Sequence, residues 1–392
     1  MKNRNLKTIL LAVLVLVSLQ GFSQEEESDE MHKSMFHLSF ITPLGTNGIQ
    51  SWNTINHFSL NMFAGFSGGL EGVEVAGFAN GLKKDMKGVQ VAGFCNNTFG
   101  YAEGLEIAGF YNYNHRDVKG MQIAGFANAA LGSVEGVQIS GFANHSQGSS
   151  MGQFAGFMNT SMGKKNGLQV AGFANFSRGE GVGAQISGFA NANIDYIKGV
   201  QVAGFVNVAK KIKGFQIAPF NVADTIESGV AIGVWSIVRN GYKTIQVGGN
   251  ETFLGEVSFK SGVKKFYNII AIGANVKSNT VKWGWGYGIG TLWSVSQKFE
   301  LGLEAMSYHM NEDRWWNNNT NLLNRLNLTA SYQFSETFSV YAGPAWNVWV
   351  TSLKSGETMD PTFNDWNVYD RSTSRNRVTM YPGLNAGIRI SL

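Results

Sequence analysis

Between residues 72 and 229 the hydrophobic and polar positions recur with a fixed period. Each unit holds an apolar segment of the type Gly-Val-Gln-Val-Ala-Gly-Phe-Ala-Asn, followed by a polar spacer. The glycines of the Gly-Phe pairs are 16 residues apart, except for one interval of 15, and lie at Gly77, Gly93, Gly109, Gly125, Gly141, Gly156, Gly172, Gly188 and Gly204. A short fixed period of this kind is typical of a repeat array.

One repeat is long enough for two short extended segments and their turns. The apolar half is rich in valine and isoleucine and predicts a strand, whereas the polar half is too short for a packed helix. A glycine such as Gly88 or Gly104 leads each unit, and we expect a turn with positive φ there. The pattern predicts a β-solenoid of about ten turns over residues 72–229, because a membrane-spanning hairpin needs two strands of about ten residues each.

Stacked turns place equivalent residues above one another. The recurring glutamines and asparagines are therefore expected to form amide ladders, and the phenylalanines an aromatic row. The valines have the opposite parity to the Gln-Ala-Phe-Asn set, so the pattern leaves open which face lies inside. We expect a bend at the Gly-Phe step that turns both valine and phenylalanine inward.

After residue 230 the period of 16 is replaced by strict alternation over longer segments. Leu384, Ala386, Ile388 and Ile390 alternate with polar or small residues up to the end of the chain. Alternation over about ten residues, rich in aromatic residues, predicts an antiparallel outer-membrane-type β-barrel over residues 230–392. The alternative is a soluble sandwich or barrel of the same strands.

The strand count and the connections predict a topology for this barrel. The segments 230–238, 243–249, 253–263, 266–276, 281–296, 298–310, 322–335, 337–352 and 378–392 read as strands. Residues 35–71 hold further strands, and adding 36–43 gives an even total of ten, with the repeats as an excursion between the first two strands. Short turns near 297 and 336 alternate with long polar connections over 311–321 and 353–376, as they do between periplasmic turns and outer loops.

The N-terminal segment and the composition indicate where in the cell the protein is located and which partners it has. Residues 1–23 combine a basic start, an apolar run and a small-residue cleavage site, which predicts a secretory signal peptide, and an acidic spacer follows at 24–34. Without Lys2, Arg4 and Lys7 of the signal, 28 basic residues face 27 acidic ones, so the charge indicates no nucleic-acid partner. The single cysteine, Cys95, cannot form an internal disulfide and reads as a neutral variant of the repeat.

No motif in the chain predicts a catalytic, cofactor-binding or metal site. The run Gly65-Phe66-Ser67-Gly68-Gly69 matches a nucleophile elbow, but a strand rather than a helix is expected after it. The glycines between Gly284 and Gly290 alternate with aromatic residues at strand period, so they form the small face of a strand rather than a dinucleotide loop. The six histidines follow no ligand spacing.

Aromatic residues in the long connections are the candidate partner contacts. Trp315 and Trp316 lie in one Asn-rich connection, and Trp366 and Tyr369 lie in the last one. Exposed side chains of this kind anchor interfaces, here with an extracellular protein or glycan. The alternative is that they form an aromatic girdle at the membrane boundary.

Taken with its flanking segments, the chain resembles a family of surface-repeat proteins of bacterial outer envelopes. The segments that carry the resemblance are FHLSFITPLG, the tandem GVQIAGFAN units, GYKTIQVGGNETF and SVYAGPAWNV. The resemblance implies the outer membrane or the cell surface as the location, outer-membrane lipid as a partner and no catalytic residues. We therefore expect a non-enzymatic structural or adhesin-like surface protein, with a small outer-membrane pore or transport component as the alternative.

Overall fold

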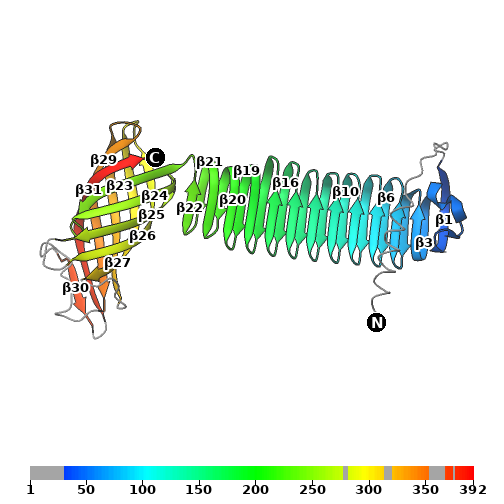
Figure 1. Ribbon diagram of the computed structural model, residues 1–392, viewed down its shortest axis with the longest axis horizontal. Helices are drawn as coiled ribbons and strands as arrows, with labels where there is room; N and C mark the ends of the chain where they lie inside the picture. The colour runs from blue at the N-terminus through cyan, green and yellow to red at the C-terminus, as the bar shows by residue number, and fades with distance from the viewer. Residues whose placement is uncertain (1–30, 277–280, 313–319, 353–366, 374–375) are drawn as a thin grey trace, which may run out of the picture.

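The chain folds into two β-structured modules in tandem. The computed structural model describes residues 31–276, 281–312, 320–352, 367–373 and 376–392. A parallel β-solenoid of about 11 turns is followed by a closed, eight-stranded antiparallel β-barrel (Figure 1). The predicted all-β fold, a solenoid followed by an antiparallel barrel, is confirmed. The predicted signal peptide and residues 24–30 of the acidic spacer lie outside the described residues.

Each regular turn of the solenoid has a longer strand and a shorter strand, joined at one end by the Gly-Phe step. The longer strands are β4 (Gly69–Ala76), β6 (Met86–Ala92), β8 (Ala102–Ala108), β10 (Val118–Ala124), β12 (Val134–Ser140), β14 (Ser150–Ala155), β16 (Lys165–Ala171) and β18 (Gly181–Ser187). The shorter ones are β5 (Ala79–Leu82), β7 (Cys95–Thr98), β9 (Tyr111–Asn114), β11 (Ala127–Ala130), β13 (Ala143–Ser146), β15 (Met158–Ser161) and β17 (Ala174–Ser177).

The two ends of the solenoid depart from this scheme. The first turn consists of β1 (His32–Ile41), β2 (Leu44–Gly45), a 3-10 helix η1 (Gly48–Asn53) and β3 (Thr54–Ser67). In the last turns each shorter strand merges with the longer strand that follows it, in β19 (Ala190–Ala203), β20 (Val206–Ile217) and β21 (Phe220–Ile232), and the solenoid ends with the short strand β22 (Trp235–Val238). Neighbouring turns pair in parallel, mostly with equivalent residues side by side, as with Gln138 and Gln122.

Amide side chains fill the interior of the solenoid. Asn96 Nδ2 donates to Asn112 Oδ1 (2.9 Å), and the same bond recurs from turn to turn. A second ladder runs through the glutamines, in which Gln138 Nε2 donates to Gln122 Oε1 (2.8 Å). Both predicted amide ladders are therefore present, and they are buried because each amide satisfies the next.

The phenylalanines and valines face outward, so the expectation that both would point inward is wrong. Rings from Phe78 to Phe205 stack on the outside with centroids 4.7 to 5.0 Å apart between successive turns. Phe126, for example, is 40% exposed. The bend at the Gly-Phe step exists, but it turns the ring away from the amides, which need one another as hydrogen-bond partners.

The leading glycines have positive φ, as predicted, except in the unit of Met151 and Gly152, but they lie within the longer strands rather than in turns. Gly104 has a φ of 133° and pairs with Gly88 on one side and Gly120 on the other. A Cβ at Gly104 would collide with the carbonyl oxygen of Gly88. The glycine is therefore required both by its backbone conformation and by the close stacking of the turns.

The barrel begins after the solenoid and closes on its own first strand. Its eight strands are β23 (Tyr242–Asn250), β24 (Gly255–Val263), β25 (Phe266–Asn275), β26 (Lys282–Ser294), β27 (Phe299–Glu312), β28 (Asn321–Gln333), β29 (Phe338–Thr351) and β31 (Arg377–Ser391). Closure comes from the antiparallel pairing of β23 with β31. A short strand, β30 (Tyr369–Ser372), extends β31 beyond the closed wall.

The predicted count of ten barrel strands is corrected to eight. Residues 36–43, expected to open the barrel, belong to β1 and its following turn, where β1 pairs in parallel with β3 in the first solenoid turn. Residues 230–238, expected as a barrel strand, lie in β21 and β22 of the last solenoid turns. The solenoid is thus not an excursion from the barrel, and it continues past residue 229, the predicted end of the repeats, to β22.

The last solenoid turn packs directly against the outside of the barrel wall. Asn268 of β25 accepts a hydrogen bond from Ser236 N (3.0 Å) and donates one to Gly233 O (2.8 Å). Ser261 of β24 donates to Ser236 O (2.8 Å). This contact covers the free edge of the solenoid, which would otherwise be open to pairing with another chain.

Candidate functional site

The two faces of the barrel wall differ in chemistry. Along the strands, residues that point outward are mostly apolar, whereas those that point inward include polar and charged groups as well as aromatic and aliphatic ones. Exposed outward residues include Ile272, Trp285, Leu303, Leu328, Trp346 and Ile388. The inward positions carry charged groups that are buried within the barrel, and these groups are the candidate functional site.

The first buried group, which we call the lumen cluster, consists of Lys260, Glu304, Arg389, Gln246 and Tyr267. Glu304 lies at its centre: it forms ion pairs with Lys260 and with Arg389 (3.5 Å), and it accepts a hydrogen bond from Tyr267 OH (2.8 Å). Gln246 Oε1 accepts from Lys260 Nζ (2.6 Å) and Arg389 Nε (2.9 Å). Two cations share one carboxylate and one amide, so each charged group in the cluster has a partner.

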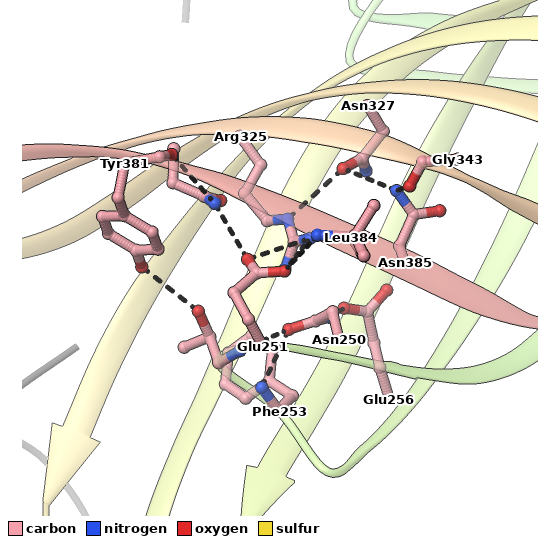
Figure 2. Close-up of polar contacts among 12 residues, drawn as sticks. Asn250, Glu251, Phe253, Glu256, Arg325, Asn327, Gly343, Tyr381, Leu384 and Asn385 are labelled. Atoms are coloured by element: carbon pink, nitrogen blue, oxygen red, sulfur yellow. Dashed lines mark hydrogen bonds and ion pairs between the residues drawn. The ribbon is translucent and has the colours of Figure 1, made fainter. Parts of the chain in front are cut away.

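The second buried group closes the opposite end of the barrel (Figure 2). The connection between β23 and β24 folds inward, and Glu251 accepts hydrogen bonds from Arg325 Nη2 (3.3 Å), Asn347 Nδ2 (2.8 Å) and the backbone N–H of Leu384 (2.9 Å). Phe253 of the same connection is fully buried. We call the connection of residues 251–254 the plug.

A core of aromatic and aliphatic side chains fills the barrel interior and joins the lumen cluster, through Tyr267, to the plug, through Phe253. They are Phe253, Tyr267, Ile269, Ala271, Leu292, Met306, Tyr308, Met310, Leu323, Trp349 and Tyr381. The alternating glycines of β26 make room for them, since a Cβ at Gly286 would lie 2.5 Å from the ring of Tyr308. The prediction that Gly284 to Gly290 form the small face of a strand is therefore confirmed, and the barrel interior is a packed core.

A hollow lies at the end of the barrel that holds the C-terminus. It has a volume of about 400 Å³ and is lined by residues that include Lys243, Lys264, Glu300, Glu336 and Arg389. Lys264 pairs with Glu300 (2.6 Å) at its wall. The hollow ends at the lumen cluster, so we call it the vestibule.

No family model, no curated protein and no solved structure matches the chain. The geometry of the two modules is therefore the main support for a functional assignment.

Of the predicted partner contacts, the structure describes one. Tyr369 lies on β30, is 41% exposed and sits beyond the closed wall at the end of the barrel that the plug closes. Trp315, Trp316 and Trp366 fall outside the described residues. Beside Tyr369, Asp370 pairs with Arg377 (2.6 Å), which fixes the strand pair that carries it.

The remaining motifs have structural explanations. Ser67 ends β3, is buried, and accepts a hydrogen bond from Asn56 Nδ2 (2.8 Å), with strand β4 following as expected. Cys95 is buried at a position that holds alanine in other turns. Within the described ranges, no cluster of three His, Cys, Asp or Glu side chains is arranged for a metal ion.

Among the residues that the structure describes, no helix has the length and apolar character needed to cross a membrane.

Sequence reasoning missed the lumen cluster and the plug. A signal was present: Arg389 stands between Ile388 and Ile390, and Glu304 stands between Leu303 and Ala305. A charge at an inward position of a strand with an apolar outer face indicates a buried partner. The partners themselves come from strands that are distant in sequence, so the pairing required the closed register of the barrel.

Proposed function

We propose that this chain is a non-enzymatic structural protein of the bacterial outer membrane and cell surface, anchored by its barrel. The observation that carries the proposal is the closed barrel with an apolar outer band and a packed interior. Transmembrane barrels need this arrangement, because every backbone group must be paired within the wall and the outer side chains must face lipid. The outward tryptophans Trp285, Trp293 and Trp346 suit the membrane boundary.

The binding role of the protein is proposed for the end of the barrel that carries β30. The C-terminus and the short turns lie together at the opposite rim, and in barrels of this type that rim faces the periplasm. The long connections then face outward, with Tyr369 among them, toward an extracellular protein or glycan. The resemblance to surface-repeat proteins of outer envelopes supports the same assignment.

A small pore is the second candidate, and the vestibule is the observation that favours it. The plug and the core packed above it oppose ion flow, since eight strands enclose a lumen that side chains can fill. The proposal therefore expects no stepwise conductance from the wild-type chain in planar bilayers. A steady single-channel conductance would replace the structural role with the pore.

The proposed outer-membrane location is tested by cell fractionation. The mature chain, produced in a Gram-negative host, should enter the outer-membrane fraction, require detergent for extraction, and migrate differently before and after boiling. Recovery of the chain in the soluble periplasmic fraction, with a single migration position, would overturn the outer-membrane assignment and support the soluble barrel instead.

A further inference from the structure

The solenoid has an apolar exterior, although much of its interior is filled by the amide ladders, with buried apolar side chains such as Leu82, Val118 and Ile212 beside them. The side chains on its outer faces and along its Gly-Phe ends include Phe126, Ile139, Phe142, Ile186 and Phe205, each about two-fifths exposed. The interior positions of the same turns hold the amide ladders. Apolar surface that continues over the whole length of a module marks a contact with an apolar partner.

Charged residues of the solenoid gather along one edge only. In each unit, the ten residues or so that run from the leading glycine past the Gly-Phe step contain no Asp, Lys or Arg, and the glutamates among them, Glu74 and Glu106, are buried in the ladder. The charged residues occupy the polar turns and the first residues of the next strand. There, Lys211 pairs with Glu227 (2.6 Å), and this hydrogen bond lowers the pKa of Glu227. We call this side the charged edge and the opposite side the phenylalanine edge.

The backbone N–H groups at the phenylalanine edge are paired, as an apolar medium requires. Each N–H of the Gly-Phe step bonds to the preceding turn: Gly125 N donates to Ala108 O (3.1 Å), and both Phe126 N and Ala127 N donate to Phe110 O. Lipid provides no hydrogen-bond partners, so only segments with all backbone groups satisfied can enter it. The N–H groups of this edge meet that condition, and nearly equal bonds recur at the following turns.

The solenoid and the barrel are arranged so that both can occupy one membrane. The charged edge of the last turn leads through Arg239 and Asn240 into β23 at the rim that holds the C-terminus, where Leu392 N donates to Lys243 O (3.0 Å). Figure 1 shows the solenoid extending sideways from the barrel wall rather than along the barrel axis. The charged edge therefore lies level with the charged rim, and the phenylalanine edge lies level with the apolar band.

The apolar depth of the solenoid fits the thickness of the band. Six residue steps separate the leading glycine Gly136 from Phe142, which at about 3.3 Å per residue gives about 20 Å. Outer-membrane barrels have an apolar band about 25 Å tall. A solenoid immersed from the rim side would therefore place its phenylalanine edge deep in the hydrocarbon layer.

We propose that the solenoid is inserted in the bilayer beside the barrel, with its apolar faces and phenylalanine edge in contact with lipid acyl chains and its charged edge at the aqueous interface. The occupant of the apolar surface is lipid, because that surface continues the outer band of the barrel across the junction at Ser236 and Asn268. The inference rests on the proposed outer-membrane location of the barrel.

The test measures the depth of single labels in the whole chain. In a Cys95→Ala background, a fluorescent label is placed in turn at Ile139→Cys and Glu135→Cys, on one strand, and at Leu328→Cys on the barrel exterior. The labelled chains are reconstituted into phosphatidylcholine vesicles with either a quencher attached to the lipid chain or aqueous iodide. The Ile139→Cys label should lose fluorescence to the lipid quencher as strongly as the Leu328→Cys label, and the Glu135→Cys label should lose it only to iodide.

The contrary outcomes separate the two proposals. Iodide quenching at Ile139→Cys with lipid quenching at Leu328→Cys would place the solenoid in water and refute the insertion, while leaving the membrane anchor intact. Protection of Ile139→Cys from both quenchers would assign the surface to a second copy of the chain, which also refutes lipid contact. Lack of lipid quenching at Leu328→Cys would contradict the outer-membrane location itself.

Discussion

Replacing each of two adjacent asparagines of β7 by alanine tests how much the amide ladder stabilises the solenoid, because only one of the two belongs to the ladder. Asn96 is completely buried; its Nδ2 donates to Ile107 O (2.8 Å) and Asn112 Oδ1 (2.9 Å), and its Oδ1 accepts from Asn80 Nδ2 (3.0 Å). Asn97 lies on the other face of the strand, and within the described structure its Oδ1 has no hydrogen-bond partner. The replacement Asn96→Ala therefore removes three bonds, whereas Asn97→Ala breaks none made by that oxygen.

The expected cost follows from the groups left unpaired. Asn80 Nδ2 keeps its bond to Val91 O (2.8 Å), so Ile107 O and Asn112 Oδ1 are the acceptors that lose a donor. A buried polar group without a partner costs about 1–3 kcal/mol, which gives about 2–6 kcal/mol for Asn96→Ala. Because about 1.4 kcal/mol corresponds to a tenfold change in an equilibrium constant, opening of these turns should become about 30-fold to 20,000-fold more frequent.

Native-state hydrogen exchange of the whole chain in detergent micelles measures this opening. Amides of β5, β7 and β9 should exchange faster in Asn96→Ala, with the effect fading over the neighbouring turns, because each turn contacts only the turns beside it. Barrel peptides provide the internal reference, and Asn97→Ala is the matched control. Equal acceleration in the two variants would refute the argument that the ladder, rather than strand propensity, holds these turns together.

Two further substitutions test the interiors of the two modules. Gln138→Glu replaces a ladder amide that donates to Gln122 Oε1 (2.8 Å) and accepts from Gln153 Nε2 (2.8 Å), so it should leave a buried charge that costs about 3–5 kcal/mol. The exposed Gln147→Glu is its control, and similar denaturant midpoints for the two solenoids would contradict the prediction. Gly286→Ala places a methyl group against the ring of Tyr308 and should lower the temperature at which the barrel loses its heat-modifiable migration, whereas Gly255→Ala meets no atom within 4 Å and should not. An unchanged transition in Gly286→Ala would show that the barrel interior has unused space.

The period of the repeats was enough to predict the solenoid, but not which face lies inside. The rule that apolar side chains are buried favoured Val137 and Phe142, yet Gln138 and Asn144 are the buried residues. Each buried amide forms hydrogen bonds with the equivalent amides of the neighbouring turns. These bonds exist only when equivalent residues of successive turns lie side by side, so the sequence of a single unit does not reveal them. The natural glutamates fit the same logic, since Glu106 also accepts from Asn114 Nδ2 (3.1 Å) and Thr98 Oγ1 (3.2 Å).

The alternation of apolar and other residues predicted the eight barrel strands, because a strand whose outer face is apolar carries an apolar residue at every second position. The same signal misplaced residues 36–43 and 230–238, whose composition resembles a barrel strand although their partners are parallel solenoid strands. The lumen cluster could not be predicted from the sequence, for a different reason. Lys260 and Glu304 lie on strands that are not neighbours in the wall, so only the curvature and closure of the barrel bring them together.

Because the solenoid turns stack evenly, the length of the solenoid can change without altering its two ends. Every interior turn meets an equivalent turn on each side, so inserting or deleting one unit of 16 residues changes the rod by about 4.8 Å and disturbs neither end. The two ends are the fixed parts: β22 is covered by the barrel, and β1 is paired with β2. Gene duplication within the array can therefore adjust the reach of the protein in small, uniform increments while the anchor stays the same.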